Sequence, residues 1–440
     1  MGLKVLKFGG TSLADAEHFR QVAEIVKSDP TRRYVVASAP GKRTSGDTKI
    51  TDLLYKCYSL AAAEEDITEV FNEIKGRYTD IITALNIDLD LTEAFEKIRL
   101  SVIHSSGRDY VASRGEYLNG MILAKYLGFS FIDAKKVIFF NEDGSFNAEK
   151  TNDVLRDRLS NCEYAVIPGF YGSMPNGTIK TFSRGGSDIT GSIVARAASA
   201  TLYENWTDVS GFLMADPRII ENPKGIDTIT YKELRELSYM GATVLHEDAI
   251  FPVRYSKIPI NIRNTNKPED KGTFIVPETD VISDCVITGV AGRTGFSSIT
   301  VEKDMMNSEL GLGRKVLQVL EEHSISFEHF PSGIDTMTVI VATKALADKR
   351  GDVLAGICKN INPDNIFVED NLALIAVVGR GMVKAKGTAA RIFTALANVG
   401  VNIRMIDQGS SELNIIVGVD SNDYIVALNA IYDEFVNKTK

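Results

Sequence analysis

The sequence has 440 residues, of which 44% are hydrophobic and 24% charged, and its formal net charge is −9. This length exceeds one ordinary hydrophobic core and predicts two to four domains, while the acidic balance argues against a general nucleic-acid binder. No run of about 20 apolar residues occurs, so we expect no membrane span. The four cysteines lie far apart without a CxxC pair, which favours reduced thiols of a cytoplasmic protein over a metal site or a disulfide framework.

The chain opens with a predicted strand over residues 3–8, followed by Gly9, Gly10 and a helical pattern. A glycine turn after a strand lets backbone amides approach a phosphate closely, and the helix start adds its dipole. Lys7, inside the strand, could direct its ammonium group at a transferring phosphoryl group. The stretch lacks the usual GxxxxGK[ST] phosphate loop. By itself it is therefore equally compatible with tight packing of a strand against a helix.

Up to about residue 280, strand-like runs alternate with helical ones. The runs 34–39 and 164–170 are short, continuous and rich in β-forming residues, as in strands covered on both faces, and helical patterns span 50–65 and 116–128. This alternation predicts an α/β domain with a mainly parallel sheet between layers of helices. Glu116 is expected at a helix entry, either as a surface acid or as a receptor for a substrate ammonium group.

Two further stretches, FSRGGSD (182–188) and NWTDVSGFLMADPR (205–218), combine charged residues with glycine. Arg184 beside two glycines suits bidentate capture of a carboxylate or phosphate. Ser187 is a suitable N-cap residue and Asp188 falls in the first helical turn, so helix capping alone could explain both. The second stretch follows a strand, where open α/β sheets bind ligands, although a surface turn is the alternative.

Beyond residue 284 the sequence repeats itself with a shift of 76 residues. The apolar positions coincide without a gap, for example Val316 with Ile392 and Val339 with Ile415. Each copy is predicted as strand, helix, strand, strand and helix, with the first strands in 285–292 and 372–379. A period this long indicates a duplicated small α+β domain. The predicted domains are therefore 1–283, 284–370 and 371–440.

The motifs KFGGTS, SRGE, FSRGGSD and WTDVSGFLMADPR occur in the order and approximate spacing of the aspartate kinase family, and ELSYMGATVLH (236–246) resembles a fifth family block. The repeated tail resembles the paired ACT regulatory domains of that family. This resemblance implies an amino-acid-kinase fold followed by two ferredoxin-like ACT domains. It also implies a monofunctional kinase that converts L-aspartate and ATP to 4-phospho-L-aspartate, the first step towards lysine, threonine and methionine.

The resemblance also implies roles for individual residues. Lys7 and Asp188 would be catalytic, with magnesium brought as MgATP and no metal ligand from protein side chains. Arg184 would hold the α-carboxylate of aspartate and Glu116 its ammonium group, with Thr51 and Ser187 nearby. The residues implied around ATP are Lys7, Phe8, Gly9, Gly10, Thr207, Asp208, Leu213 and Arg218.

Three positions depart from the family pattern, the first being Ser183, which precedes the arginine where the family often has GRGGSD. Thr243 stands where many members carry a lysine directed at the nucleotide, and Arg254 or Lys257 could compensate; Leu213 replaces a frequent tyrosine. Two rival functions remain open at this point: a kinase of the same fold acting on another small acid such as glutamate, and an inactive amino-acid sensor.

The tail is expected to bind an end product, with lysine favoured and threonine, alone or together with lysine, as the alternative. Glu328 and Asp335 in the first repeat align with Arg404 and Ser411 in the second, so a cationic ligand should prefer the first repeat. ACT pairing between chains implies a homodimer or a dimer of dimers, and we expect neither a nucleic-acid nor a membrane partner. The residues implied for the effector site are Met306, Ser326, Phe327, Glu328, Ser332, Ile334 and Asp335.

Overall fold

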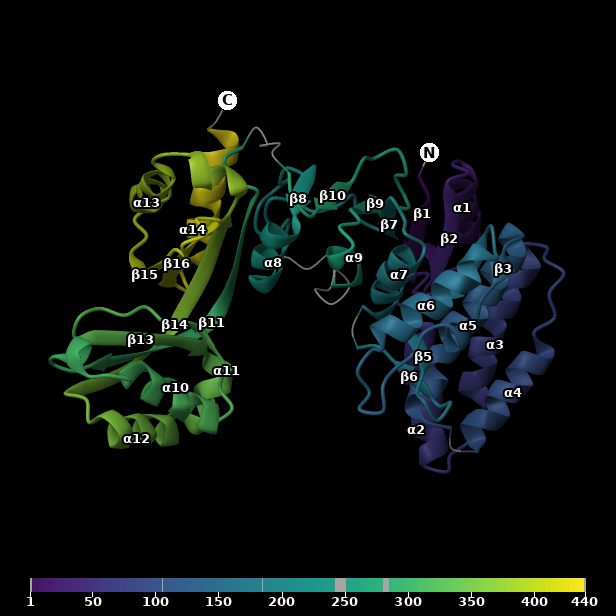
Figure 1. Ribbon diagram of the computed structural model, residues 1–440, viewed down its shortest axis with the longest axis horizontal. Helices are drawn as coiled ribbons and strands as arrows, with labels where there is room; N and C mark the ends of the chain where they lie inside the picture. The colour runs from purple at the N-terminus through teal and green to yellow at the C-terminus, as the bar shows by residue number, and fades with distance from the viewer. Residues whose placement is uncertain (1, 105, 184, 242–250, 280–284, 439–440) are drawn as a thin grey trace. The chain divides into compact units, whose positions relative to one another are not determined.

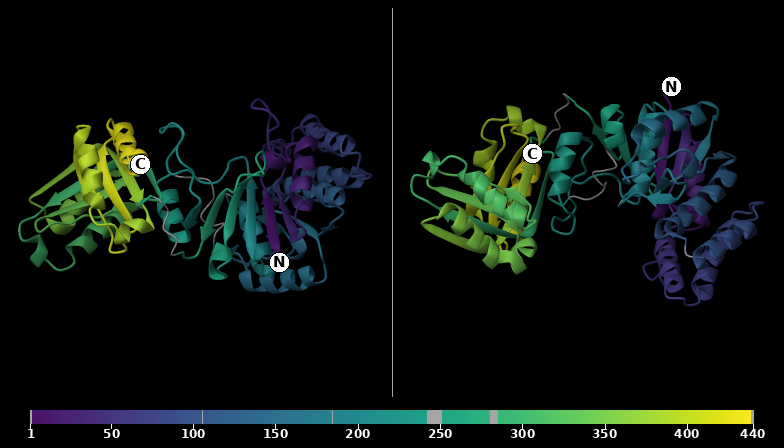
Figure 2. Two further views of the ribbon diagram at one scale, coloured as in Figure 1. Left: turned by 90° about the horizontal axis from the view of Figure 1, so that it is seen from above. Right: turned by 60° about the horizontal axis from the view of Figure 1, so that its bottom comes forward.

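The chain divides into two compact units in the computed structural model (Figures 1 and 2), and each is described by itself. Two short segments that precede residue 280 belong to the second unit, and the predicted domain boundaries stay predictions. The first unit comprises Met1–Phe212, Gly225–Tyr231 and Thr243–Thr279, and the second comprises Leu213–Lys224, Lys232–Ala242 and Asp280–Lys440. The structure describes residues 2–104, 106–183, 185–241, 251–279 and 285–438.

The first unit is built on an eight-stranded sheet with the order β3-β4-β2-β1-β7-β9-β10-β8. All neighbouring strands run parallel except β9 and β10, which are antiparallel. The mainly parallel sheet predicted from the sequence is therefore confirmed. The strands are β1 (Lys4–Phe8), β2 (Arg32–Ala37), β3 (Ser130–Phe131), β4 (Ala165–Pro168), β7 (Leu202–Thr207), β8 (Thr228–Thr230), β9 (Ile260–Asn264) and β10 (Thr273–Val276).

Helices cover both faces of this sheet (Figure 1). One face shares a hydrophobic core with α1 to α5, and the other contacts α7, which packs against α6 and α9. A small hairpin of β5 (Tyr171–Ser173) and β6 (Ile179–Thr181) stands apart from the main sheet. The helices are α1 (Ala16–Lys27), α2 (Ile50–Ala62), α3 (Thr68–Ala84), α4 (Thr92–Ile103), α5 (Arg108–Leu127), α6 (Ala148–Ser160), α7 (Gly186–Ala197) and α9 (Phe251–Tyr255).

The second unit contains a six-stranded sheet with the order β12-β13-β11-β14-β16-β15, antiparallel at every pairing. Its strands are β11 (Gly289–Glu302), β12 (Phe327–His329), β13 (Thr336–Ala342), β14 (Asn365–Val378), β15 (Ile403–Asp407) and β16 (Asn414–Asp420). Its helices are α8 (Tyr231–Tyr239, from its second residue on), α10 (Leu312–Glu322), α11 (Thr343–Leu346), α12 (Arg350–Ile361), α13 (Thr388–Asn398) and α14 (Tyr424–Tyr432).

The internal repeat is visible in this unit. The helices α10 and α13 begin 76 residues apart, and each follows a glycine in the left-handed region, Gly311 with φ 76° and Gly387 with φ 85°. Glycine adopts this conformation at little cost, whereas other residues are strained there. The same backbone turn therefore starts the first helix of each half.

The first strand of the first half differs from the sequence prediction, which placed it at residues 285–292. The structure has one long strand, β11. Its residues 296–302 correspond in the repeat to residues 372–378 of β14, which lie 76 positions later in the sequence. β13 pairs with 296–302 and β16 with 372–378, while β11 and β14 pair along most of their length. The two halves therefore share the continuous strands β11 and β14. The register shift between Arg293 and Phe296 changes the direction of β11, but β11 stays paired with β14 on both sides of it.

One face of the six-stranded sheet packs on α10 and α12. The sheet is strongly curled, since His329 Nδ1 on one edge strand lies 2.6 Å from Asp407 Oδ2 on the other. A cavity of about 320 Å³, lined by Ser332, Ser298 and Thr338 among others, opens on the face away from these helices.

None of the helices in the described ranges is long and apolar enough to cross a membrane.

Candidate active site

The carboxyl ends of four neighbouring parallel strands, β1, β2, β4 and β7, meet at one edge of the sheet of the first unit. This is the edge at which open α/β sheets bind ligands. Backbone hydrogen bonds join the loops that follow these strands. They run from Gly9 N to Trp206 O (3.1 Å), from Gly41 N to Gly10 O (2.8 Å) and from Gly169 N to Ala37 O (2.9 Å).

Lys7 is the charged centre of this edge. Its side chain is only 9% exposed, and its Nζ lies 2.6 Å from Oδ1 of Asp188 in the first turn of α7. Asn205, directly beside Lys7 in the register of β1 and β7, donates from Nδ2 to the same oxygen (2.8 Å). Side chains alternate along a strand, so Lys7 and Asn205 face α7 whereas Phe8 and Trp206 stack on the opposite face. One carboxylate oxygen therefore fixes the position of a buried cation.

The glycine turn beside Lys7 exposes backbone amides. A Cβ atom at Gly10 would lie 2.9 Å from the carbonyl oxygen of Ala39, so only glycine lets the loops after β1 and β2 meet. Within the described residues, the amides of Gly10 and Thr11 have no hydrogen-bond acceptor. They stand at the start of a 3₁₀ helix, Thr11–Leu13. Unpaired amides at a helix start next to a lysine form a suitable site for an anion.

A second group of buried polar atoms lies beneath the loop after β2. Glu116 on α5 is 5% exposed, and its carboxyl accepts the amide of Ala39, but its Oε2 has no partner among the described residues. Burial raises the pKa of this carboxyl to about 8, against smaller opposing effects of nearby amides and the charge of Arg114. One turn further, Asn119 donates to Ser38 O (2.6 Å), while its Oδ1 is also buried without a described partner.

Two details of helix position differ from the sequence prediction. Glu116 was expected at a helix entry, but α5 begins at Arg108 and Glu116 lies in the helix interior, where a helix dipole cannot explain its presence. Ser187 was expected as an N-cap residue, but α7 begins at Gly186 after Gly185, whose φ is 71°. Gly185 is therefore the N-cap residue, and Ser187 packs instead against Gly169, where a Cβ would lie 2.6 Å from its Oγ.

The other predicted substrate residues are placed as follows. Thr51 is the second residue of α2, whose first amide, at Ile50, donates to Pro40 O in the loop after β2 (3.3 Å). Thr51 therefore lies in the first turn of a helix that borders the loop covering Glu116. Arg184 lies outside the described residues, so its predicted contact with the substrate stays a prediction.

The predicted nucleotide residues fall in different parts of the chain. Thr207 ends β7 and its hydroxyl donates to Asp208 Oδ1 (3.2 Å), so this pair continues the strand that carries Asn205. Phe8 has a fully buried side chain, so only its backbone could face a nucleotide. Leu213 and Arg218 belong to the second unit, where Arg218 is 84% exposed and paired with Asp216.

Thr243 lies outside the described residues, as does the rest of the family block after Gly241. The two cations suggested as replacements, Arg254 and Lys257, are exposed at and just after α9, a helix that packs against α7. Their role towards the nucleotide stays a prediction. In the described part of the chain, no group of three or more His, Cys, Asp or Glu side chains is arranged to hold a metal ion.

The predicted effector residues lie at one end of the first half of the second unit. The amide of Met305 donates to Asp335 Oδ1 (3.0 Å), and that of Asn307 to Ile334 O (3.2 Å), so the turn containing Met306 packs on this loop. Phe327 and Glu328 start the edge strand β12 directly after Ser326, and the carboxylate of Glu328 accepts a hydrogen bond from the hydroxyl of Tyr239 (2.5 Å). The isolated bridge of Ser332 to Met337 holds the intervening loop.

Sequence reasoning missed two residues of the site, Asn205 and Asn119. Asn205 stands one residue before the recognisable WTD stretch, and only the register between β1 and β7 shows that it shares Asp188 with Lys7. Asn119 lies three residues after Glu116, a helical spacing that places both on one face of α5. That spacing was a signal available in the sequence, whereas the strand register was not.

Comparison with known proteins identifies the family of the chain. The profile of the amino acid kinase family matches residues 2–264, and an ACT domain profile matches residues 375–435. The chain is 40% identical to aspartokinase 3 of Bacillus subtilis over 450 aligned positions, which cover 98% of each sequence. It is also 53% identical to the Clostridium acetobutylicum aspartate kinase of known crystal structure, with a TM-score of 0.90 over 99% of this chain and 100% of that one.

A more distant neighbour is aspartokinase III of E. coli, which has been solved in two complexes. The complex with aspartate and ADP, the R-state, matches with a TM-score of 0.74 and 26% identity over 98% of this chain and 99% of the other. The complex with lysine and aspartate, the T-state, matches with a TM-score of 0.72 and 26% identity over 99% of both chains. The chain therefore belongs to the amino acid kinase family. Within that family it is an aspartate kinase, with an ACT domain in its second unit.

Proposed function

We propose that this chain transfers the γ-phosphoryl group of MgATP to the β-carboxylate of L-aspartate at the edge formed by β1, β2, β4 and β7, giving 4-phospho-L-aspartate for the synthesis of lysine, threonine and methionine. The observation that carries the proposal is the buried pair of Lys7 and Asp188, 2.6 Å apart, beside the amides of Gly10 and Thr11, which have no acceptor among the described residues. The protein would act in the cytoplasm.

Lys7 is proposed to neutralise charge on the transferring phosphoryl group. The attacking carboxylate of aspartate is already ionised and needs no general base, so the protein has mainly to position anions and offset their repulsion. A lysine held by Asp188 and Asn205 is preorganised for this task, because little reorganisation is needed when charge shifts in the transition state. Magnesium would arrive as MgATP, with the glycine turn near its phosphates and Thr207 and Asp208 near the nucleotide.

Aspartate is proposed to lie between this lysine and α5. Glu116 Oε2 and Asn119 Oδ1 are buried acceptors without described donors, and a substrate ammonium group carries three donors that could satisfy them. Arg184 would take the α-carboxylate, as the family motif implies. Glu116 and Arg184 suit any α-amino acid, so selection of aspartate over glutamate depends on side-chain length.

The decisive experiment is formation of aspartyl hydroxamate from aspartate, MgATP and hydroxylamine, with L-glutamate as the matched alternative substrate. We expect product with aspartate and at least about tenfold less with glutamate, because one extra methylene displaces the carboxylate from the phosphoryl group. Preference for glutamate would show that glutamate, and not aspartate, is the substrate. Absence of product with both acids would contradict the proposed kinase reaction.

Asn205→Ala is expected to lower kcat by about tenfold while changing the KM values for ATP and aspartate less than about threefold. The variant removes one hydrogen bond to the carboxylate that holds Lys7, an interaction worth about 1 kcal/mol or somewhat more. Asn261→Ala is the matched control. Asn261 is another buried asparagine of the same sheet, and it bonds to the carbonyl of Lys271 (3.1 Å). A normal kcat for Asn205→Ala, or an equal loss in the control, would contradict this positioning role.

We further propose that the second unit binds lysine as a feedback inhibitor in its first half and that the ACT domains join the chains into a homo-oligomer. The E. coli relative solved with lysine supports the effector. Ile334, 69% exposed, and Phe327, 44% exposed, offer apolar surface to a partner chain. Lysine would inhibit by binding an inactive arrangement more tightly than an active one.

Asp335→Asn is expected to weaken lysine binding by about 10-fold to 150-fold, the range for loss of a charge-assisted hydrogen bond. The amide oxygen of asparagine can still accept the Met305 amide, so the turn is kept while the charge is removed. The measurement is calorimetry with lysine and, in parallel, threonine. Asp364→Asn serves as control, because Asp364 accepts the amide of Asp304 in the same way (2.7 Å). Equal affinity of both variants would contradict a role of Asp335, and binding of threonine alone would change the effector.

A further inference from the structure

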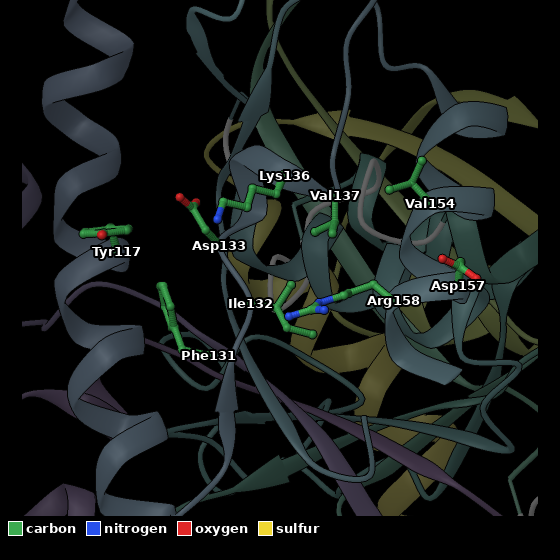
Figure 3. Close-up of a pocket in the computed structure, with 9 residues that line it drawn as sticks. All are labelled: Tyr117, Phe131, Ile132, Asp133, Lys136, Val137, Val154, Asp157 and Arg158. Atoms are coloured by element: carbon green, nitrogen blue, oxygen red, sulfur yellow. The ribbon is translucent and has the colours of Figure 1, made fainter. Parts of the chain in front are cut away.

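A cavity of about 550 Å³ opens in the first unit beside the edge strand β3 (Figure 3), and none of its lining residues is among those proposed to act in catalysis. Its floor is apolar and consists of Ile132 and Val137, which are 3% and 2% exposed, and Val154 stands at one side with 37% of its surface exposed. Tyr117 and Phe131 form the opposite wall. Their ring centroids lie 5.6 Å apart with an interplanar angle of 80°, an aromatic corner that a third ring can join.

Two cations with uncommitted charge line the same cavity. The side chains of Lys136 and Arg158 make no hydrogen bond or ion pair with any described residue, and Figure 3 shows the guanidinium group of Arg158 reaching across the apolar floor. Of the two acids in the lining, Asp133 is already engaged by the hydroxyl of Tyr171 (2.7 Å). Asp157 lies beside Val154, at the end opposite the two rings (Figure 3). Both acids keep their negative charge, so the lining is neutral in sum, and the two cations without an ion pair to a described residue are the groups in it that can hold an anionic end group.

We propose that this cavity binds an organic anion of the aromatic carboxylate class, with its ring against Tyr117 and Phe131 and its carboxylate between Lys136 and Arg158. The apolar floor and aromatic corner favour a flat hydrocarbon body, and the two free cations favour an anionic end group. The cavity is large enough for a single ring with a short acidic side chain. The proposal does not depend on the phosphoryl-transfer mechanism, because its test is binding.

The test is calorimetric titration of the full chain with 3-(4-hydroxyphenyl)propionate, in the presence of saturating MgADP and aspartate so that the catalytic site is occupied. We expect binding to the unmodified chain and at least about tenfold weaker binding to the double variant Lys136→Ala/Arg158→Ala. The uncharged probe 3-(4-hydroxyphenyl)propanamide should bind the unmodified chain more weakly than the carboxylate probe by a comparable factor, because the two probes differ mainly in charge.

The matched control is the double variant Lys135→Ala/Arg156→Ala, which removes the same charge from neighbouring exposed positions that do not line the cavity. It should bind the probe within about twofold of the unmodified chain. The proposal is overturned if the unmodified chain does not bind the probe at millimolar concentration, or if both double variants bind it equally. Binding of inorganic phosphate as tightly as the probe would overturn the part assigned to the aromatic ring.

Discussion

Lys7→Met is expected to lower the turnover number for aspartate phosphorylation by about a hundredfold or more, with the fold retained. The variant replaces a preorganised positive charge by an apolar side chain of similar length, and removal of one such electrostatic contact to a transition state costs about 10²-fold to 10³-fold in kcat. The loss should appear in kcat more than in KM, because the charge on the phosphoryl group is redistributed as the bond to the leaving oxygen breaks.

The control for Lys7 is Lys4, which lies three residues earlier on the same strand. Lys4 also pairs with an aspartate, Asp29, at 2.8 Å, but its side chain is 27% exposed and it lies at the opposite end of β1 from the glycine turn. Lys4→Met should therefore keep kcat within about threefold. Circular dichroism and thermal melting of both variants would separate loss of chemistry from loss of fold. A Lys7→Met enzyme with near-normal turnover would contradict the proposed role.

Glu116→Gln is expected to raise the KM for aspartate by about 10-fold to 150-fold and to leave the KM for ATP within about twofold. The carboxylate proposed to hold the substrate ammonium group contributes a charge-assisted contact of about 1.5–3 kcal/mol, which the amide cannot replace. Glutamine has nearly the same size, so the packing of α5 is kept. The matched control is Glu96→Gln on α4, an exposed glutamate paired with Arg99, which should change neither constant. Loss of ATP affinity with normal aspartate affinity would show that the roles are wrongly assigned.

The same variant gives a pH test. In the free enzyme, burial raises the pKa of Glu116 to about 8, so the carboxyl is mostly protonated at pH 7 and mostly ionised at pH 9. If only the ionised form binds the ammonium group, the apparent affinity for aspartate is proportional to the fraction of Glu116 that is ionised. That affinity should therefore rise by about tenfold between pH 7 and pH 9. Glu116→Gln has no group to titrate and should lack this rise. An equal pH dependence in both enzymes would contradict the assignment.

Several features of this protein follow from the sequence by itself. The alternation of strand and helix patterns, the glycine turn after β1 and the repeat of 76 residues are local or periodic properties, because a residue's face on a helix or strand depends on its spacing from its neighbours. The mainly parallel sheet between helices was accordingly predicted and is confirmed. The motifs around Lys7, Glu116 and Asp188 identified the family for the same reason, since each is a short run of residues whose spacing is visible along the chain.

Contacts between distant segments could be decided only by the tertiary structure. Asn205 meets Asp188 because β1 and β7 lie side by side in one register, and no spacing along the chain contains that register. Burial of Glu116 depends on the loop after β2 covering the interior of α5, so neither its raised pKa nor its unpaired oxygen was predictable. The strand β11 runs through both halves of the second unit because β13 and β14 continue its pairing, although its sequence resembles a shorter strand. Local periodicity thus determined which elements form, and long-range packing decided which side chains share a site.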